Sequence, residues 1–369
     1  MRRIGVVGGG LTGLAIAFRR GVAGDSVSVF ESSTRFGGQL WTEHADGFVV
    51  EHGAEGFVAR SQAVPGLAAS LGIDSDLIVQ SENRSYGFDG RRLQSLAPGE
   101  AAAFLGFQVA RDDLGKGIRT FRRGMGQLAE ALVQALTVVD RRGHTGPLAT
   151  NRVALRPSSR VTTIAPSGRR WRMTVEGQPD EEFDAVVVAT PAAVAASILG
   201  ATFGEAARAL AEAPTLSSCT VTLAYPRPAI DHPLDATGFV VAEAHQENGF
   251  RASTFITSKF PDRAPAGGVS LRLFFRPSDE DLTVMSDAAW TARAEASLSR
   301  VLLVRGRPLC SWVSRWSSAL PVFDPAHVSR VQRVTAALAG TGVQIAGSAF
   351  HGAGIDASVR SAEAAARVY

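Results

Sequence analysis

The fold is decided at the start of the chain, where residues 3–13 read Arg-Ile-Gly-Val-Val-Gly-Gly-Gly-Leu-Thr-Gly. Residues 3–7 form a short apolar run, which is typical of a fully buried strand in a parallel sheet. The next six residues, from Gly8 to Gly13, have the pattern G-x-G-x-x-G, and residues 14–20 continue with apolar side chains on one side of a helix. This order predicts the strand, tight turn and helix with which a Rossmann-type unit begins.

A second strand and an acidic residue complete the pattern. Residues 27–30 (VSVF) predict the strand, and Glu31 follows it, 18 residues after Gly13. The glycines permit a tight turn and a close approach of backbone to a pyrophosphate, and the helix N-terminus offers unpaired N–H groups to the phosphates. A carboxylate at position 31 can accept hydrogen bonds from both ribose hydroxyls. We therefore predict a dinucleotide site, because a glycine turn without function does not account for Glu31.

Composition excludes several classes of protein. The chain has 369 residues, of which 45% are hydrophobic and 20% charged, so a disordered or fibrous protein is excluded. Only Lys116 and Lys259 are lysines among 38 basic residues, but the arginines are scattered and the net charge is +3. Nucleic-acid binding would require a basic stripe or cluster, so no nucleic-acid partner is expected.

Cysteine, histidine and hydropathy patterns exclude further classes. Cys219 and Cys310 stand 91 residues apart, which predicts no disulfide framework and makes a cytoplasmic location the expectation. The seven histidines are dispersed, so no metal site is predicted. No apolar run approaches the ~20 residues of a transmembrane helix, although peripheral membrane contact stays open.

The segment after Glu31 indicates which dinucleotide is bound. It reads Glu-Ser-Ser-Thr-Arg-Phe-Gly-Gly-Gln over residues 31–39, an E-x-x-x-R-x-G-G extension that resembles FAD proteins of the amine-oxidase type and is lacking in nicotinamide enzymes. Arg35 can reach the pyrophosphate, while Gly37 and Gly38 let a loop pass close to the cofactor. We predict FAD held without a covalent bond, because both cysteines lie outside the segments that match flavin contacts.

Four further stretches extend the resemblance over the whole chain. Residues 46–57 resemble "DGF..E.GP.SF", residues 121–128 "F.GGMGTL", residues 253–265 "TF.S.KFP.RAP", and residues 347–361 "GN...GVGI.DCVRSG". The chain thus resembles the flavin-containing amine oxidase superfamily, and most of all its protoporphyrinogen oxidase branch. The motifs and the resemblance together predict an FAD site made of Gly8, Gly10, Leu11, Thr12, Gly13, Glu31, Ser32, Arg35, Gly37, Gly38, Gln39, Gly53, Ala54, Glu55, Val161, Ala189, Thr190, Gly347, Ser348, Gly354, Ile355 and Val359.

The predicted fold is α/β, with a discontinuous Rossmann-type FAD-binding domain and an α+β substrate domain containing a mostly antiparallel sheet. The FAD domain is predicted to comprise residues 1–57, 151–212 and 328–369, and the substrate domain residues 58–150 and 213–327. Period-2 alternation predicts the sheet strands, which are Cys219–Tyr225, Gly238–Ala244, Ala252–Thr257, Val269–Phe275 and Leu309–Trp316. Helices are predicted over 192–212, 286–304, 328–338 and 354–368, and an exposed loop over 141–147.

One departure from the family concerns the substrate side. Family members that oxidise protoporphyrinogen carry a helical substrate-binding region between the segments matched here by residues 46–57 and 121–128. Only residues 58–120 fill that interval, so the region is predicted to be shortened. Whether a partner protein replaces the missing part stays open, as does the oligomeric state.

Few side chains are predicted to take part in the reaction, because the flavin itself carries the hydride chemistry. Trp316 matches an aromatic that lies beside the flavin ring in the family, with a core tryptophan as the alternative. Arg84 resembles an arginine that anchors a substrate carboxylate, with a solvated surface residue as the alternative. Lys259 stands in a segment different from that of the lysine that holds a water at the flavin. The helix starting near Gly354 can stabilise negative charge on the reduced flavin, unless it follows an ordinary turn.

The function predicted from the sequence is an FAD-dependent oxidase or desaturase that removes a hydride from a C–H bond next to nitrogen and uses O2 as acceptor. The shortened interval favours an amine, pyrrole-type or heterocyclic small molecule as the substrate. Two alternatives stay open: a protoporphyrinogen or coproporphyrinogen oxidase of tetrapyrrole biosynthesis, and a catalytically silent flavin-binding assembly protein.

Overall fold

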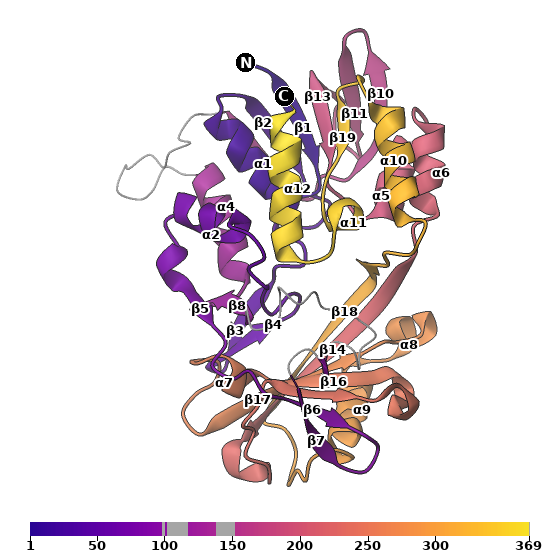
Figure 1. The fold of residues 1–369 in the computed structure, drawn as a ribbon. Helices are drawn as coiled ribbons and strands as arrows, with labels where there is room; N and C mark the ends of the chain where they lie inside the picture. The colour runs from indigo at the N-terminus through magenta and orange to yellow at the C-terminus, as the bar shows by residue number, and fades with distance from the viewer. Residues whose placement is uncertain (98–99, 102–116, 138–151, 369) are drawn as a thin grey trace.

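The computed structural model describes residues 1–97, 100–101, 117–137 and 152–368 (Figure 1). The sheet that contains the N-terminal strand lies at one end of the molecule, and a larger sheet lies at the other. The loop predicted over 141–147, and part of the interval 58–120, fall outside the described residues.

The first sheet is five-stranded and parallel throughout, in the order β19-β13-β1-β2-β9. Its strands are β1 (Arg3–Val7), β2 (Ser26–Phe30), β9 (Val153–Arg156), β13 (Ala185–Val188) and β19 (Val343–Ile345). The apolar runs at 3–7 and 27–30 therefore form the central pair, as their hydrophobicity predicts. Strand β13 pairs with β1 in parallel, with Val188 opposite Val7.

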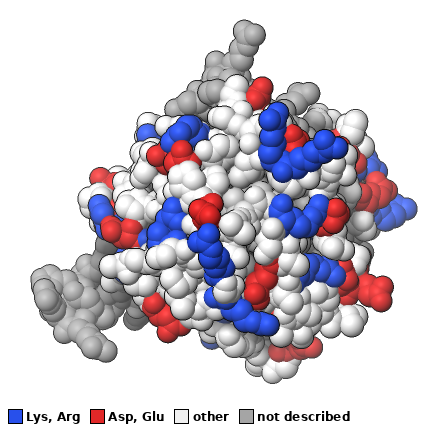
Figure 2. All heavy atoms as spheres, turned by 90° about the horizontal axis from the view of Figure 1, so that it is seen from below, with Lys and Arg blue, Asp and Glu red and all other residues white. Residues whose placement is uncertain are grey.

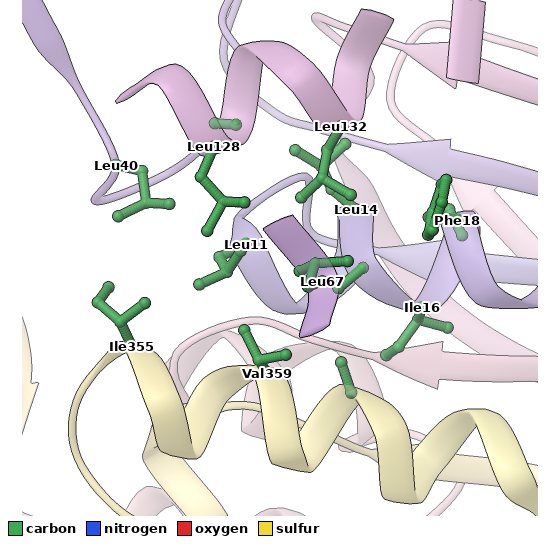
Figure 3. Packing of buried hydrophobic residues seen from close by; sticks show 14 of the residues in the cluster. Leu11, Leu14, Ile16, Phe18, Leu40, Leu67, Leu128, Leu132, Ile355 and Val359 are labelled. Carbon is green, nitrogen blue, oxygen red and sulfur yellow. The ribbon is translucent and has the colours of Figure 1, made fainter. Parts of the chain in front are cut away.

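Helices cover one face of this sheet. They are α1 (Leu11–Val22), α2 (Ala63–Ser70), α4 (Gly126–Thr137) and α12 (Ile355–Arg367). Figure 3 shows Leu14 of α1 among Leu67 of α2, Leu132 of α4 and Val359 of α12, all of them in one buried cluster. The domain division stays a prediction, but α2 and α4, which it assigns to the substrate side, share their core with α1.

The other face carries a small sheet and three helices. The sheet is antiparallel, with strands β10 (Val161–Ser167), β11 (Arg170–Val175) and β12 (Glu181–Phe183). The helices are α5 (Ala192–Leu199), α6 (Gly204–Ala211) and α10 (His327–Leu338). The segment 192–212, which is expected to be helical, forms two helices with a break: α5 ends at Leu199, and Thr202 donates its hydroxyl to the carbonyl of Ile164 at 2.6 Å.

The large sheet has seven strands in the order β18-β14-β17-β16-β15-β6-β7. All neighbours are antiparallel except β15 and β6, which confirms the mostly antiparallel prediction. The strands are β6 (Ser85–Phe88), β7 (Leu93–Leu96), β14 (Thr215–Pro226), β15 (Gly238–Val241), β16 (Phe250–Phe255), β17 (Gly268–Phe275) and β18 (Cys310–Pro321). Helices α8 (Asp279–Val284) and α9 (Asp287–Ser299) accompany the sheet.

Three predicted boundaries in this region are wrong. The strand expected to reach Thr257 stops at Phe255, because residues 256–259 form the helical turn α7 (Ile256–Lys259). The strand expected to reach Ala244 ends at Val241, where short 3₁₀ turns begin. The helix expected over 286–304 ends at Ser299.

A hairpin joins the two halves of the molecule. It consists of β3 (Thr42–Ala45) and β4 (Phe48–Glu51), while β5 (Leu77–Val79) pairs with β8 (Arg119–Phe121) nearby. Phe48 of β4 packs against Trp312 of β18, with ring centroids 5.8 Å apart. Because β4 leads directly into residues 53–55, this contact fixes the predicted cofactor segment against the large sheet.

Candidate active site

The glycine turn has the shape that a pyrophosphate requires. Gly8 has a φ of 103°, and a Cβ there would meet the carbonyl oxygen of Ala189 at 2.5 Å. A Cβ at Gly13 would lie 1.9 Å from the carbonyl oxygen of Gly8, so the helix packs directly on the turn. A Cβ at Gly10, by contrast, would meet only Gly38 Cα among the described residues, at 4.0 Å. The turn is therefore closed at its ends and open above its middle glycine, where a phosphate can approach the backbone.

The loop after β2 lies directly against this turn. The amide of Gly37 donates to the carbonyl of Gly9 at 2.8 Å, and Gly38 has a φ of 56°. Arg35 donates to the carbonyls of Phe36 at 3.0 Å and Gly38 at 2.7 Å. In the structure, the guanidinium of Arg35 therefore holds the shape of the loop. The two glycines bring the loop beside the open position above Gly10, as the sequence predicts.

Glu31 stands at the end of β2 beside the same turn. Its Oε2 accepts a hydrogen bond from the amide of Gly9 at 2.8 Å, and its Oε1 accepts from the amide of Ser33 at 2.8 Å. The Ser32 hydroxyl lies 3.4 Å from Oε1. A carboxylate oxygen can accept more than one hydrogen bond, so both oxygens retain capacity for ribose hydroxyls.

The start of α12 meets the start of α1. Thr12 donates to the carbonyl of Ser358 at 3.4 Å, and the amide of Gly347 donates to Ser361 at 2.9 Å. Figure 3 shows Leu11 of α1 facing Ile355 and Val359 of α12. No described side chain caps either helix, and a Cβ at Gly354 would have no described atom within 4 Å. Two uncapped helix N-termini therefore lie at one place, where they favour negative charge.

The remaining predicted contacts border this place. Ala189 donates its amide to the carbonyl of Val7 at 2.8 Å, so Ala189 and Thr190 follow the carboxyl end of β13 beside the turn. Ser348 begins the short helix α11 (Ser348–His351) directly after Gly347. Val161 begins β10 and is buried in the cluster that contains Phe30.

Residues 53–55 lie against Gln39. A Cβ at Gly53 would be 1.8 Å from the carbonyl oxygen of Gln39, and the amide of Ala54 donates to that oxygen at 3.1 Å. The Gln39 side chain donates to the carbonyl of Ala319 on β18 at 3.0 Å. The predicted cofactor segment thus connects the glycine loop with the large sheet.

A buried group of charges, the junction cluster, adjoins this segment, and of its members only Glu55 was among the predicted site residues. Glu55 contacts Lys259 Nζ at 2.8 Å and Arg272 Nη1 at 3.8 Å. Burial alone would raise the pKa of Glu55, but Lys259 and Arg272 outweigh it, so the pKa lies below its usual value. Arg272 also donates to the carbonyl of Gly53 at 2.7 Å. The members of the junction cluster are Glu51, Glu55, Lys259, Arg263 and Arg272.

Glu51 behaves differently from Glu55 within the cluster. Burial raises its pKa to about 7, although the Met125 amide and the Thr42 hydroxyl both donate to it at 2.7 Å. Arg263 donates to the carbonyl of Phe121 at 2.8 Å and lies close enough to Glu51 to lower the pKa in part. A sequence signal for the cluster did exist: Arg272 is the only charged residue of strand β17.

Trp316 lies where the two halves meet, and its place beside the flavin stays a prediction. Its indole N–H donates to the backbone carbonyl of His52 at 2.7 Å. The His52 ring stacks on Trp41 at 3.9 Å and bonds to Glu43 and Ser314. His52 was not among the predicted site residues.

Arg84 is not brought together with Trp316. Its side chain is 56% exposed and pairs with Asp235 at 3.1 Å and Glu82 at 3.8 Å. It precedes β6, which is five strands from β18 in the sheet order. At ~4.8 Å per strand, about 24 Å of sheet separates the two strands, more than a small substrate can span.

The comparison with protein families settles the family. The family model described as "Flavin containing amine oxidoreductase" matches residues 11–107 and 95–368. The chain belongs to this family. As a flavin-containing amine oxidoreductase it is an FAD-dependent oxidoreductase, and the open glycine turn, Glu31 and the paired helix N-termini fit that cofactor.

Coproporphyrinogen III oxidases from two bacteria align with almost the whole chain. The coproporphyrinogen III oxidase of Bacillus subtilis (strain 168) is 23% identical over 459 residues, which cover 99% of this chain and 97% of the relative. The coproporphyrinogen III oxidase of Mycobacterium tuberculosis (strain ATCC 25618 / H37Rv) is 28% identical, covering 97% and 95%. The first alignment spans 459 positions for a chain of 369 residues, so at least 90 positions of it have no residue of this chain.

Solved structures support the fold. A structure from Exiguobacterium sp. 255-15, named as a candidate protoporphyrinogen oxidase, has a TM-score of 0.82 at 20% identity and covers 100% of this chain and 98% of its own. Cyclohexylamine oxidase from Brevibacterium oxydans IH-35A has a TM-score of 0.72 at 14% identity, covering 100% and 98%. These likenesses confirm the α/β fold of this flavoprotein family.

Two surface properties complete the description. Figure 2 looks at the molecule from below the view of Figure 1 and shows basic and acidic side chains interspersed on that face. Among the helices of the described residues, none is both long enough and apolar enough to cross a membrane.

Proposed function

We propose that the protein is an oxidase that removes a hydride from a carbon next to nitrogen and passes the electrons to O2. The observation that carries the proposal is the junction at which Trp316 donates to the carbonyl of His52, one residue before Gly53. A substrate lying on β18 there would face the predicted FAD-binding segment. FAD supplies the hydride acceptor when bound, and the residues of the chain orient the reactants and exclude water.

Two classes of substrate follow from different observations. A reduced tetrapyrrole is the first, because relatives named coproporphyrinogen III oxidase align with nearly the whole chain. A smaller nitrogen-containing metabolite is the second, because the short interval 58–120 would leave the substrate side more open. An amine or heterocycle would lose the hydride from the carbon next to nitrogen, whereas a porphyrinogen would lose it from a methylene bridge carbon, one bond further from the pyrrole nitrogen.

Anaerobic mixing of the FAD-loaded protein with candidate substrates tests the proposal. We expect coproporphyrinogen III, protoporphyrinogen IX or a member of a panel of amines and heterocycles to bleach the visible flavin absorbance, and admitted air to restore it with formation of peroxide. Bleaching only by small amines would favour the second class. A flavin that no candidate reduces, or that O2 does not reoxidise, would contradict the oxidase proposal; the former would favour the silent binding protein.

A further inference from the structure

We propose that Glu43, His52 and Ser314 form a proton relay between solvent and the junction where Trp316 lies. The inference rests on the proposed oxidase function, because that reaction must release a proton from the site and take one up again in each turnover. It assigns a task to three polar residues that neither the predicted FAD contacts nor the substrate anchor account for.

Two hydrogen bonds join the three side chains. His52 Nε2 lies 2.7 Å from Glu43 Oε2, and His52 Nδ1 lies 2.8 Å from Ser314 Oγ. The Glu43 side chain is 41% exposed, whereas that of His52 is only 6% exposed and Ser314 is buried. The chain of bonds therefore leads from water to the interior through a ring with one nitrogen on each side.

The inner end of the relay lies at the junction. Ser314 stands on β18 two residues before Trp316, and alternation along the strand puts both side chains on one face of the sheet. Trp316 itself donates to the carbonyl of His52. Ser314 pairs across the sheet with Thr220, whose hydroxyl accepts from Arg272 at 3.2 Å. The inner hydroxyl is thus placed next to the residues that hold the predicted FAD segment.

The relay requires a neutral imidazole, and the surroundings of His52 favour one. Burial lowers the pKa of His52; Glu43 acts in the opposite direction, and Arg272 and Arg35 add to the lowering, so the pKa lies below its usual value. The ring then carries one N–H at neutral pH and can accept a proton on one nitrogen while releasing one from the other. Stacking on Trp41 at 3.9 Å holds the ring between its two partners.

The proposed reaction uses the relay in both directions. When R2CH–NHR gives up a hydride, the cation R2C=NHR⁺ remains, and its proton leaves through Ser314, His52 and Glu43 to give R2C=NR. Reoxidation consumes one proton, because anionic reduced flavin, O2 and H⁺ together give oxidised flavin and H2O2. When a proton moves outward, Nδ1 of His52 gains a proton from Ser314 and Nε2 loses one to Glu43. When a proton moves inward, the two steps are reversed. The ring therefore returns to its starting tautomer after each turnover.

Reoxidation of the holoenzyme tests the relay without a substrate. The flavin is reduced with dithionite, mixed with O2 in H2O or D2O, and followed by its visible absorbance together with a pH-indicator dye. We expect His52→Gln and Glu43→Gln to slow reoxidation and proton uptake by about 100-fold, the lower end of the usual range for losing a proton-transfer group. Added imidazole should restore part of the rate to His52→Ala. Glu176→Gln is the matched control, since Glu176 is 67% exposed and pairs only with Arg160 in the described contacts.

A second readout is independent of activity. Nitrogen chemical shifts of the labelled histidine ring should show His52 singly protonated at neutral pH, with Glu43→Gln changing its tautomer balance. A permanently doubly protonated ring, or variants that reoxidise at the wild-type rate with the same solvent isotope effect, would overturn the relay. If the oxidase function itself is wrong, a different result is expected: the reduced wild-type enzyme does not react with O2. In that case the relay is refuted as well.

Discussion

Two alanine variants distinguish the roles of Gly10 and Gly13, the second and third glycines of the G-x-G-x-x-G motif. Gly10 has φ −73° and ψ −177°, a conformation that alanine also adopts, and its Cβ would meet only Gly38 Cα at 4.0 Å among the described residues. Gly10→Ala should therefore cost no more than about 1 kcal/mol of stability, the usual effect at a helix N-cap. Its methyl group, however, would stand in the open space above the turn.

Gly13→Ala should act on the fold itself. Its Cβ would lie 1.9 Å from the carbonyl oxygen of Gly8, whereas real contacts of this kind stay beyond 3.0 Å, so helix and turn must separate by more than 1 Å. Forcing extra atoms into a packed interior costs about 1–3 kcal/mol, and the better helix propensity of alanine returns up to about 1 kcal/mol. We expect a net loss of about 2 kcal/mol.

Two measurements distinguish the variants: urea unfolding of the apoprotein, and titration of the apoprotein with FAD. Gly10→Ala should unfold like the wild type but bind FAD roughly 150-fold more weakly, because displacing the pyrophosphate breaks charge-assisted hydrogen bonds that together contribute about 3 kcal/mol. Gly13→Ala should lose both stability and affinity. If Gly10→Ala binds FAD as tightly as the wild type, the pyrophosphate does not lie over this turn; if Gly13→Ala unfolds at the wild-type urea concentration, the close packing is refuted.

Four further outcomes are expected. Glu31→Ala should weaken FAD binding by roughly 10- to 150-fold, since a hydrogen bond to a charged group contributes about 1.5–3 kcal/mol; unchanged affinity in a titration would contradict the ribose assignment. Acid precipitation should release intact FAD into the supernatant, and flavin left in the pellet would contradict non-covalent binding. Arg84→Ala should leave KM for a small carboxylate substrate unchanged, because Arg84 is half exposed, already pairs with Asp235 and lies about 24 Å of sheet away from Trp316; a tenfold rise in KM would instead support the substrate-anchor role. Because burial raises the pKa of Glu51 from 4.5 to about 7, the stability that this residue contributes is complete below pH 4.5 and is lost as the pH rises to about 7. Between pH 4.5 and about 7, the free energy of unfolding should fall more steeply with pH in the wild type than in Glu51→Gln. Equal slopes in the two proteins would refute the raised pKa of Glu51.

The FAD side of the molecule could be predicted because its signals are local. The strand, the glycine turn and Glu31 lie within the first 31 residues, and Gly13 packs on Gly8, only five positions before it. The apolar run at 3–7 predicts a central strand whatever its neighbours are. The presence of the large sheet could also be predicted, because its strands alternate.

The junction could not be predicted in the same way, because its contacts join distant segments. Glu55 meets Lys259 across 204 positions, and His52 meets Ser314 across 262. Alternation along a strand indicates which side chains face inward, but it does not identify their partners. Arg272 was therefore predicted only as part of a strand, without a role in the site. Arg84 is the opposite case. A local motif suggested a role at the site, but the sheet order places this residue far from Trp316.

The strand order of the first sheet also determines when the protein can acquire its cofactor during synthesis. β1 and β2 leave the ribosome first, but β1 must wait for residues 185–188 before both of its edges are paired. Helices α2 and α4 cover only part of the apolar face of α1, and the rest stays exposed until residues 355–367 have emerged, which also bring the second N-terminus to the site. Such distant pairing folds slowly and exposes apolar surface meanwhile. The nascent chain therefore cannot form the complete FAD site until residue 367 has emerged, so FAD binding is expected to follow translation of that helix.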